Sequence, residues 1–335
     1  MCVCVSIPNS VHLSPKTTEM PNTSTIRQVS LLDWSSSGTD RLPLVDLRTD
    51  RDDGTLTGGG GIVPVVHLPW PSLRSGERSG ELPPRHVGFG LLLNAELWRD
   101  HEREISSFFG ATVSRATGQS RRPWRVGCAV LIEDKERFWN EAKELGLSQQ
   151  EAAGPLPRLW QPDPLLPGVL WPRLKAILAD KLANASLPPG EPACSLRIWD
   201  LGSGAGRDVC YLAEQIKHTF ATSGGRVTVV GLDNHKASAK RCLPLWKHRG
   251  VDDYTEARLV DVTKLGSIAE QPTPICVYAV RFWHRKAIES LQRQLPAGTL
   301  FGTSHFCKPF RGAKWGFDHP KVGTLHCTAL HCTAV

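Results

Sequence analysis

The second half of the chain repeats one pattern, in which a short apolar run is followed by a turn and then by an amphipathic segment. Ile198 and Trp199 end the first apolar run, and Asp200 follows them at the carboxyl edge of the predicted strand. From residue 209 to residue 216 the apolar positions recur at helical spacing. Further apolar runs, each followed by a helical or polar crossover, predict more strands at residues 227–233, 257–261 and 274–280, and residues 295–301 are a turn into a fifth. The pattern predicts an α/β domain with an open, mostly parallel sheet, whose ligand lies beyond the strand ends.

The turn after the first strand carries Gly202, Gly204 and Gly206, so a ligand can approach its backbone closely. Dinucleotide-binding turns space their glycines as G-x-G-x-x-G, and the position of the third glycine is occupied here by Arg207. A phosphate at the start of the following helix would also lie near Asp200, and a carboxylate there opposes an anion. The turn therefore favours a ligand that carries positive charge and has no phosphate.

The segment from Asp200 to Gly206 closely resembles the first motif of class I S-adenosylmethionine-dependent methyltransferases, and residues 200–213 are similar to the tellurite-resistance and thiopurine methyltransferases. The resemblance implies a Rossmann-like domain that binds S-adenosyl-L-methionine. It implies that Asp233, at the end of the second strand, accepts the ribose hydroxyls, and that Asp261 lies beside the adenine. The cofactor residues implied in this way are Asp200, Gly202, Ser203, Gly204, Gly206, Asp233, Asn234, Asp261 and Val262.

The loop after the fourth strand faces the acceptor in this family. Here Arg281 and His284 are candidates for binding an anionic acceptor or taking its proton, and Phe282 and Trp283 are candidates for stacking on it. An Asn-Pro-Pro-Tyr type of signature is absent from the sequence, which argues against methylation of nucleic-acid bases or glutamine. We therefore expect methyl transfer by in-line displacement to a small molecule that the sequence does not identify.

Two alternatives stay open. The net charge is +7, and residues 281–321 hold eight Lys or Arg residues interleaved with aromatic ones, so this region is also suited to an RNA acceptor. Alternatively, both halves of the chain are degenerate and form a binding or regulatory protein without catalysis. We expect no metal, because Cys2-x-Cys4 and the His-Cys pairs of the tail make weak metal sites.

The first half of the chain resembles a rhodanese-like domain. Val45-Asp46-Leu47-Arg48 matches the V-D-x-R end of a strand, and residues 62–69 match the following proline-flanked segment. In this family the next strand ends in a catalytic Cys. We place that strand at residues 125–133, where Cys128 lies inside the strand and no C-x-x-G-x-R loop follows, so the domain is expected to be inactive.

A chain of 335 residues exceeds the usual size of a single core, which favours two domains. The scattered cysteines favour a reducing compartment, and we expect a cytoplasmic protein, with organelle targeting by the N-terminus as the alternative. The sequence does not indicate the oligomeric state. After the fifth strand the chain is short, so the sheet is expected to lack its last strands. The expected parts are a disordered N-terminus at 1–29, the rhodanese-like domain at 30–148, a proline-rich connector at 149–168, the methyltransferase domain at 169–321 and a low-complexity tail at 322–335.

Overall fold

The computed structural model divides the chain into two compact units, one formed by residues 1–13 with 162–335 and the other by residues 14–161. The division between residues 161 and 162 lies inside the proline-rich segment expected as a connector. The structure describes residues 3–4, 26–37, 41–49, 55–56, 65–110, 112–113, 120–121, 123–149, 157–184, 196–221, 227–264, 273–306 and 325–331.

The unit that contains the glycine turn is built on a seven-stranded sheet in the order β1-β16-β15-β14-β11-β12-β13. The five strands from β15 to β13 are parallel, with Asp200 of β11 in register with Gly231 of β12 and Tyr278 of β14. This confirms the parallel α/β sheet predicted from the apolar runs. The strands are β1 (Val3–Cys4), β11 (Leu196–Leu201), β12 (Val227–Asp233), β13 (Thr255–Leu259), β14 (Cys276–Val280), β15 (Leu300–Phe306) and β16 (Leu325–His331).

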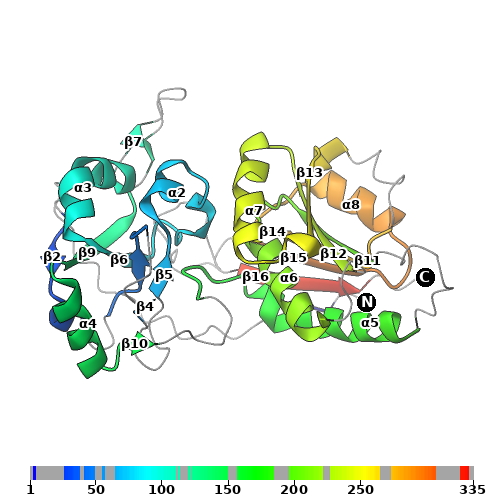
Figure 1. The fold of residues 1–335 in the computed structure, drawn as a ribbon. Helices are drawn as coiled ribbons and strands as arrows, with labels where there is room; N and C mark the ends of the chain where they lie inside the picture. The colour runs from blue at the N-terminus through cyan, green and yellow to red at the C-terminus, as the bar shows by residue number, and fades with distance from the viewer. Residues whose placement is uncertain are drawn as a thin grey trace, which may run out of the picture. The chain divides into compact units, whose positions relative to one another are not determined.

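Helices cover both faces of this sheet (Figure 1). Side chains of α8 pack on the face that carries Trp199, Leu201 and Val277, and form one apolar core with them. On the other face Trp246 of α7 lies beneath the glycine turn, and Leu170 lies against Gly302 of β15. The helices are α5 (Trp171–Asn184), α6 (Arg207–Thr219), α7 (Lys236–His248) and α8 (Arg285–Gln294), with a π-helical turn at Leu166–Leu170 and a 3-10 turn at Asp252–Tyr254.

The edge of this sheet corrects the expectation that the sheet lacks its last strands. β16 pairs antiparallel with β15, and β1 pairs antiparallel with β16, so two strands extend the sheet beyond the fifth parallel strand. The expected low-complexity tail therefore contains a strand. The N-terminal segment expected to be disordered contributes β1, and its last residues form β2 (Gln28–Val29) in the other unit. These short segments carry little periodicity of their own, and only pairing with a strand distant in sequence defines them as strands.

The unit formed by residues 14–161 holds a five-stranded parallel sheet in the order β2-β9-β6-β3-β5. Its remaining strands are β3 (Leu44–Asp46), β5 (Val65–His67), β6 (Gly88–Asn94) and β9 (Arg125–Ile132). The helices are α1 (Leu31–Ser35), α2 (Trp70–Arg74), α3 (Ala95–Phe109) and α4 (Lys135–Glu144), with a 3-10 turn at Ser79–Glu81. Two small ladders pair β4 (Thr55–Leu56) with β10 (Ser148–Gln149) and β7 (Thr112–Val113) with β8 (Ser120–Arg121).

Along the chain, the next strand of this sheet after β5 is β6. The strand that the rhodanese-like pattern places after β5 is therefore β6 and not the segment 125–133, where the sequence analysis placed it. β6 ends at Asn94, and α3 begins at the next residue, Ala95. β9, which carries Cys128, instead pairs with β2 and β6. The run Phe89-Gly-Leu-Leu-Leu93 is almost fully buried, and such a strand in a parallel sheet has no alternation by which to recognise it.

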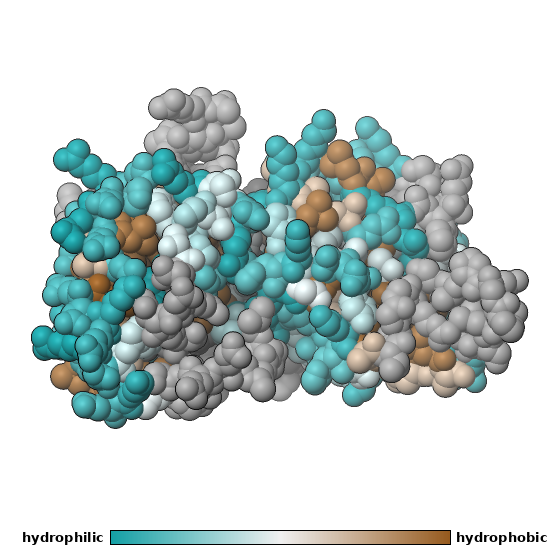
Figure 2. Space-filling model, in the orientation of Figure 1, coloured by the Kyte–Doolittle hydropathy of each residue, from teal (hydrophilic) through white to brown (hydrophobic). Residues whose placement is uncertain are grey.

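On the face shown in Figure 2, hydrophobic residues of the described surface appear as separate spots among hydrophilic ones. Large exposed apolar side chains include Leu32, Leu145, Leu243, Leu259 and Trp283, which belong to different elements. Within the described part of the chain, no helix is long and apolar enough to cross a membrane.

Candidate functional site

The three glycines between β11 and α6 all adopt left-handed backbone conformations, with φ of 74° at Gly202, 56° at Gly204 and 71° at Gly206. Backbone hydrogen bonds hold the start of the turn against the neighbouring strand. The amides of Gly202 and Ser203 donate to the Leu232 carbonyl over 2.8 and 3.1 Å. The Gly206 amide donates to the Ser203 carbonyl over 2.9 Å, which closes the turn before α6 begins. The sequence motif therefore forms the strand, turn and helix that it predicts.

The space around the three glycines differs. A Cβ on Gly202 would lie 2.9 Å from the Phe282 side chain, and a Cβ on Gly206 would lie 2.5 Å from the Cβ of Cys242. At Gly204 the nearest atom outside the immediate neighbours is the Gly202 carbonyl oxygen, 4.0 Å away. Gly202 and Gly206 are thus required by packing, whereas none of the described residues fills the space beside the Gly204 Cα, which a ligand can enter.

Asp200 lies at the base of the turn and is only 2% exposed. Burial raises its pKa well above the usual range, and the charges of Asp208 and Asp233 act in the same direction, while the neighbouring Tyr278 hydroxyl opposes them. Tyr278 is itself fully buried, and burial raises its pKa. The shift disfavours the ionised form of Asp200, and a cation close to it would favour that form, since an opposite charge is what stabilises a buried carboxylate.

Asp233, at the end of β12, connects this strand to the glycine turn. Its Oδ2 accepts a hydrogen bond from the Gly204 amide over 2.9 Å, and its Oδ1 accepts one from the His235 amide over 2.8 Å. A carboxylate has about four lone-pair sites, so each oxygen can accept a further hydrogen bond. Asp233 is partly exposed, and Asn234 beside it is exposed, so the carboxylate is accessible to a ligand hydroxyl.

Asp261 and Val262 lie beyond the end of β13. The Oδ1 atom of Asp261 accepts hydrogen bonds from the Thr263 amide over 3.0 Å and from the Thr263 hydroxyl over 2.6 Å. These bonds lower the pKa of Asp261, so it is ionised at neutral pH. Val262 is 4% exposed and packs in the apolar core with α8.

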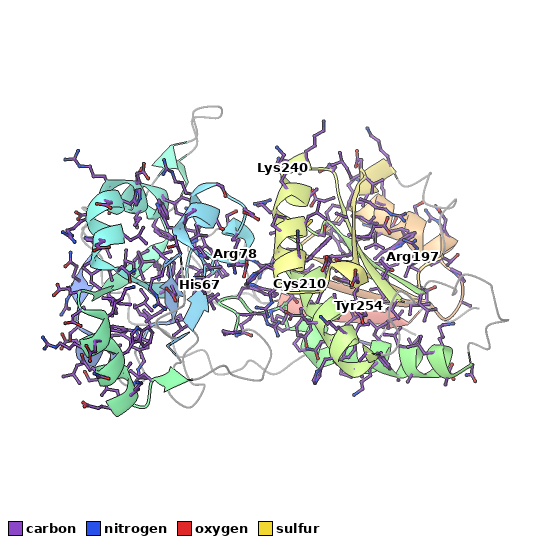
Figure 3. All side chains as sticks on the ribbon, viewed as in Figure 1. His67, Arg78, Arg197, Cys210, Lys240 and Tyr254 are labelled. Atoms are coloured by element: carbon purple, nitrogen blue, oxygen red, sulfur yellow. The ribbon has the colours of Figure 1, made fainter. Side chains whose placement is uncertain are left out.

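Ser203 stands over β12, because a Cβ on Gly231 would lie 2.8 Å from its Oγ. The structure thus brings the predicted cofactor residues of the first two strands to one edge of the sheet. Arg197 lies at the opposite end of β11 from the glycine turn. Figure 3 shows it apart from Cys210, which belongs to the first turns of α6 after that turn.

Sequence reasoning missed Asp163. Its amide donates to Asp208 Oδ1 over 3.1 Å, and its own Oδ1 accepts from the Leu165 amide over 3.1 Å. Asp163 is 4% exposed, and its Oδ2 accepts no hydrogen bond from the described residues. Burial, together with the charge of Asp163, raises the pKa of Asp208 to about 6, although the Asp163 amide and the nearby Arg281 and Arg207 oppose the shift. An Asp followed by Pro164 at the start of a helical pattern was the signal that could have identified it.

The loop after β14 holds the two acceptor candidates. Arg281 has φ of 58° and is the only non-glycine residue with positive φ in the described segments. Its amide donates to the Ser304 carbonyl over 2.7 Å. His284 caps α8, because its Nδ1 accepts from the Ala287 amide over 3.3 Å, which leaves Nε2 for other partners. Trp283 is 49% exposed, whereas Phe282 packs on the core.

The described residues contain no group of three or more His, Cys, Asp or Glu side chains arranged to hold a metal ion. The site consists of an open glycine, one buried and two more accessible carboxyl groups, and an adjacent loop with basic and aromatic side chains. It can bind a polar ligand that has a cationic end and hydroxyl groups.

No protein-family model matches the chain, and no curated protein matches it. Among solved structures, the [4+2]-cyclase SpnF is similar with a TM-score of 0.30 and 16% identity over 43% of this chain and 48% of that chain. An RNA methyltransferase from Salinibacter ruber in complex with S-adenosyl-L-homocysteine gives 0.30 and 20% over 48% and 93%. A SAM-dependent methyltransferase from Geobacter sulfurreducens in complex with the same ligand gives 0.28 and 19% over 42% and 51%. The chain thus spans about half the length of the cyclase and of the Geobacter protein.

Proposed function

We propose that residues 169–321, with the strands that extend their sheet, form a methyltransferase domain that binds S-adenosyl-L-methionine and methylates a small molecule. The observation that carries this proposal is the open side of Gly204, whose amide is bonded to the partly exposed carboxylate of Asp233 and which lies in the turn that follows the buried Asp200. A ligand with an ammonium group supplies the cation that stabilises a buried Asp200 carboxylate, and its ribose hydroxyls supply hydrogen-bond donors to Asp233. Asp200 would hold the ammonium end, and Asp233 would accept ribose hydroxyls.

The residues present fit this cofactor better than a dinucleotide. A pyrophosphate beside Gly204 would lie near Asp200 and Asp233, whose carboxyl groups disfavour an added negative charge. Burial of an anion also requires donors, and Asp233 already accepts the Gly204 amide that would otherwise face a phosphate. A cation is therefore the better match for this edge of the sheet.

The protein's own contribution to the reaction is to hold two molecules in line. When bound, S-adenosylmethionine supplies a methyl group on a sulfonium sulfur, which keeps the electron pair of the broken bond while an acceptor lone pair forms the new one. Alignment of donor and acceptor by the turn and by the β14 loop accounts for much of the acceleration in such a displacement. Because His284 Nδ1 accepts the Ala287 amide, a neutral imidazole carries its proton on Nε2, so His284 would donate a hydrogen bond to the acceptor in this arrangement and would not act as its base.

The direct test is calorimetric titration of the full chain with S-adenosylhomocysteine, with NAD as the parallel control. We expect micromolar binding of S-adenosylhomocysteine alone. Binding of NAD instead, or binding of neither by a folded protein, would reject the proposed cofactor.

Asp233→Ala tests the ribose contact. It removes an acceptor for two ribose hydroxyls and the acceptor for the Gly204 amide, so affinity for S-adenosylhomocysteine should fall by about 10- to 100-fold, the effect of losing hydrogen bonds to a charged group. Asp253→Ala, which changes an exposed acid on the 3-10 turn, is the matched control and should leave the affinity unchanged. Equal affinities for the wild type and Asp233→Ala would remove Asp233 from the site.

We propose further that residues 30–148 form a rhodanese-like domain without sulfur-transfer activity. The five-stranded parallel sheet and the buried pair of Asp46 and Arg48 support a relation to that family. β6 ends at Asn94 directly before α3, which leaves neither a thiol nor a loop to cradle an anion. Cys128 is buried in β9, and burial raises its pKa, which makes it a poor nucleophile.

The prediction for this unit is that the full chain does not transfer sulfur from thiosulfate to cyanide. Thiocyanate release should equal that of Cys128→Ser, because the thiol does not take part. Turnover that depends on Cys128 would contradict the inactive assignment.

An RNA acceptor stays as the second candidate for the methyltransferase domain. It depends on the basic region 281–321, of which residues 307–321 lie outside the described part of the chain. No observation on the described residues favours it over a small molecule.

A further inference from the structure

β13 is the last strand of the seven-stranded sheet, and in the described part of the chain it pairs only with β12. It has five residues, whereas β1, the strand at the other edge of this sheet, has two. In the five-stranded sheet the edge strands β2 and β5 have two and three residues. Short edge strands offer little backbone to an incoming strand, so of these edges β13 is the one best able to accept one.

The backbone of β13 presents alternate residues to its free side. The Val260 amide donates to the Asp233 carbonyl over 2.9 Å, so the N–H and C=O groups of the even-numbered residues of β13 point toward β12. The same groups of Thr255, Ala257 and Leu259 therefore point away from β12. A row of N–H and C=O groups on the free side of an edge strand is a template for another strand.

Side chains of opposite charge stand two positions apart on one face of β13. Glu256 Oε1 accepts a hydrogen bond from Arg258 Nε over 2.5 Å, and Glu256 Oε2 accepts one from Arg197 Nη1 over 2.6 Å. The planar guanidinium of Arg258 has further donors, which can serve a second carboxylate. Leu259 stands on the other face and is 54% exposed.

The sequence of β13 is complementary to itself when the second copy runs in the opposite direction. In an antiparallel pair centred on Ala257, Glu256 of each copy lies opposite Arg258 of the other, and Thr255 lies opposite Leu259. Residues directly opposite each other have Cβ atoms about 4.5–5.5 Å apart, so both charge pairs are within reach. An in-register parallel pair would instead place like charges opposite each other.

We propose that two copies of this chain associate through antiparallel pairing of β13, which joins their seven-stranded sheets into one. The centre of the pair fits, because Ala257 turns its N–H and C=O to the free side and two such residues exchange both hydrogen bonds. The same strand serves on both sides of the contact, as two-fold symmetry requires. The contact is small, so we expect a weak dimer that forms with rising concentration. The inference goes beyond the proposed methyltransferase function and does not depend on it.

The first test is sedimentation equilibrium of the full chain from about 1 to 500 µM, a range that includes weak dimers. We expect a monomer–dimer equilibrium in the wild type. Ala257→Pro removes an N–H that points away from β12, so the pairing with β12 is kept, and edge strands accept proline at such positions. This variant should raise the dissociation constant at least about tenfold while its urea unfolding stays cooperative.

The second test exchanges the charges. Arg258→Glu leaves two acids on the strand, and Glu256→Arg leaves two arginines. Each variant alone opposes like charges at both symmetry-related pairs, so each should dimerise about tenfold more weakly or worse. An equimolar mixture of the two places acids opposite arginines and should restore association. Restored association also shows that both variants are folded, and it decides the inference if Ala257→Pro does not fold.

Leu32→Ser is the matched control for Leu259→Ser, because both leucines are 54% exposed and Leu32 lies on α1 in the other unit. Leu259→Ser should weaken the dimer, and Leu32→Ser should not. A wild type that stays monomeric at the highest concentration overturns the inference. So does a dimer that folded Ala257→Pro leaves unchanged, or a mixture of the charge variants that does not associate.

Discussion

Replacement of Gly206 by alanine is expected to destabilise the protein by about 2–4 kcal/mol, because alanine is strained in the left-handed backbone conformation and its Cβ overpacks the site. The added Cβ would meet the Cys242 Cβ at 2.5 Å and the Trp246 ring at 2.9 Å. Neither neighbour can move freely, since Cys242 and Trp246 are almost fully buried and the Trp246 indole donates to the Gly206 carbonyl at 2.9 Å. Urea denaturation of wild type and variant measures the loss.

Gly204→Ala is the matched comparison for this prediction. It also has positive φ, but its Cβ would meet nothing closer than the Gly202 carbonyl oxygen at 4.0 Å, so the expected destabilisation is only about 1 kcal/mol. Its methyl group fills the open side of the turn, and affinity for S-adenosylhomocysteine should fall by about tenfold or more, equivalent to 1.4 kcal/mol. Equal stability losses in the two variants would contradict the packing difference, and unchanged affinity in Gly204→Ala would show that the ligand does not approach this glycine.

The second large effect concerns pH. Asp208 has a pKa of about 6 in the folded protein, above its usual value of 3.8, so folding favours its protonated form. Its contribution to stability is therefore complete at pH below about 4 and is lost as the pH rises from 4 to 6, by about 2 kcal/mol. Asp208→Asn keeps an oxygen to accept the Asp163 amide and carries no charge, so it should be more stable than the wild type at pH 7.5 and equally stable at pH 4.

Chemical denaturation of both proteins between pH 4 and pH 8 measures this difference directly. The charge of Asp208 also helps to raise the pKa of Asp200, so Asp208→Asn lowers the pKa of Asp200 as well, and the pH dependence that the variant loses belongs to the two carboxyl groups together. Asp253→Asn, an exposed acid outside the site, should follow the wild type at every pH. A stability difference between the wild type and Asp208→Asn that does not change with pH would show that Asp208 remains ionised throughout.

The sequence predicted where the site residues lie within their strands and turn, because these positions depend on backbone preference and hydrophobic periodicity over a few residues. Gly202, Gly204 and Gly206 occupy alternate positions of one turn, and all three have positive φ, which glycine adopts without strain. Apolar runs that end in Asp200 and Asp233 were read as buried strands ending at a sheet edge, and the structure has them so. Periodicity and backbone preference act over a few residues, so neither requires knowledge of the rest of the chain.

Contacts between distant residues could not be read in this way. Asp163 meets Asp208 across 45 residues of sequence, Asp233 meets Gly204 across 29, and Cys242 and Phe282 pack against the glycine turn from distant elements. β6 was missed because its apolar run does not alternate, and β1 and β16 are defined only by the partners with which they pair.

The sequence by itself determined the parallel α/β sheet, the glycine turn and the acidic strand ends. Only the tertiary structure decided which glycine is open, which carboxyl groups are buried and which charged groups lie near them, since burial and charge proximity arise from pairings that no local pattern encodes.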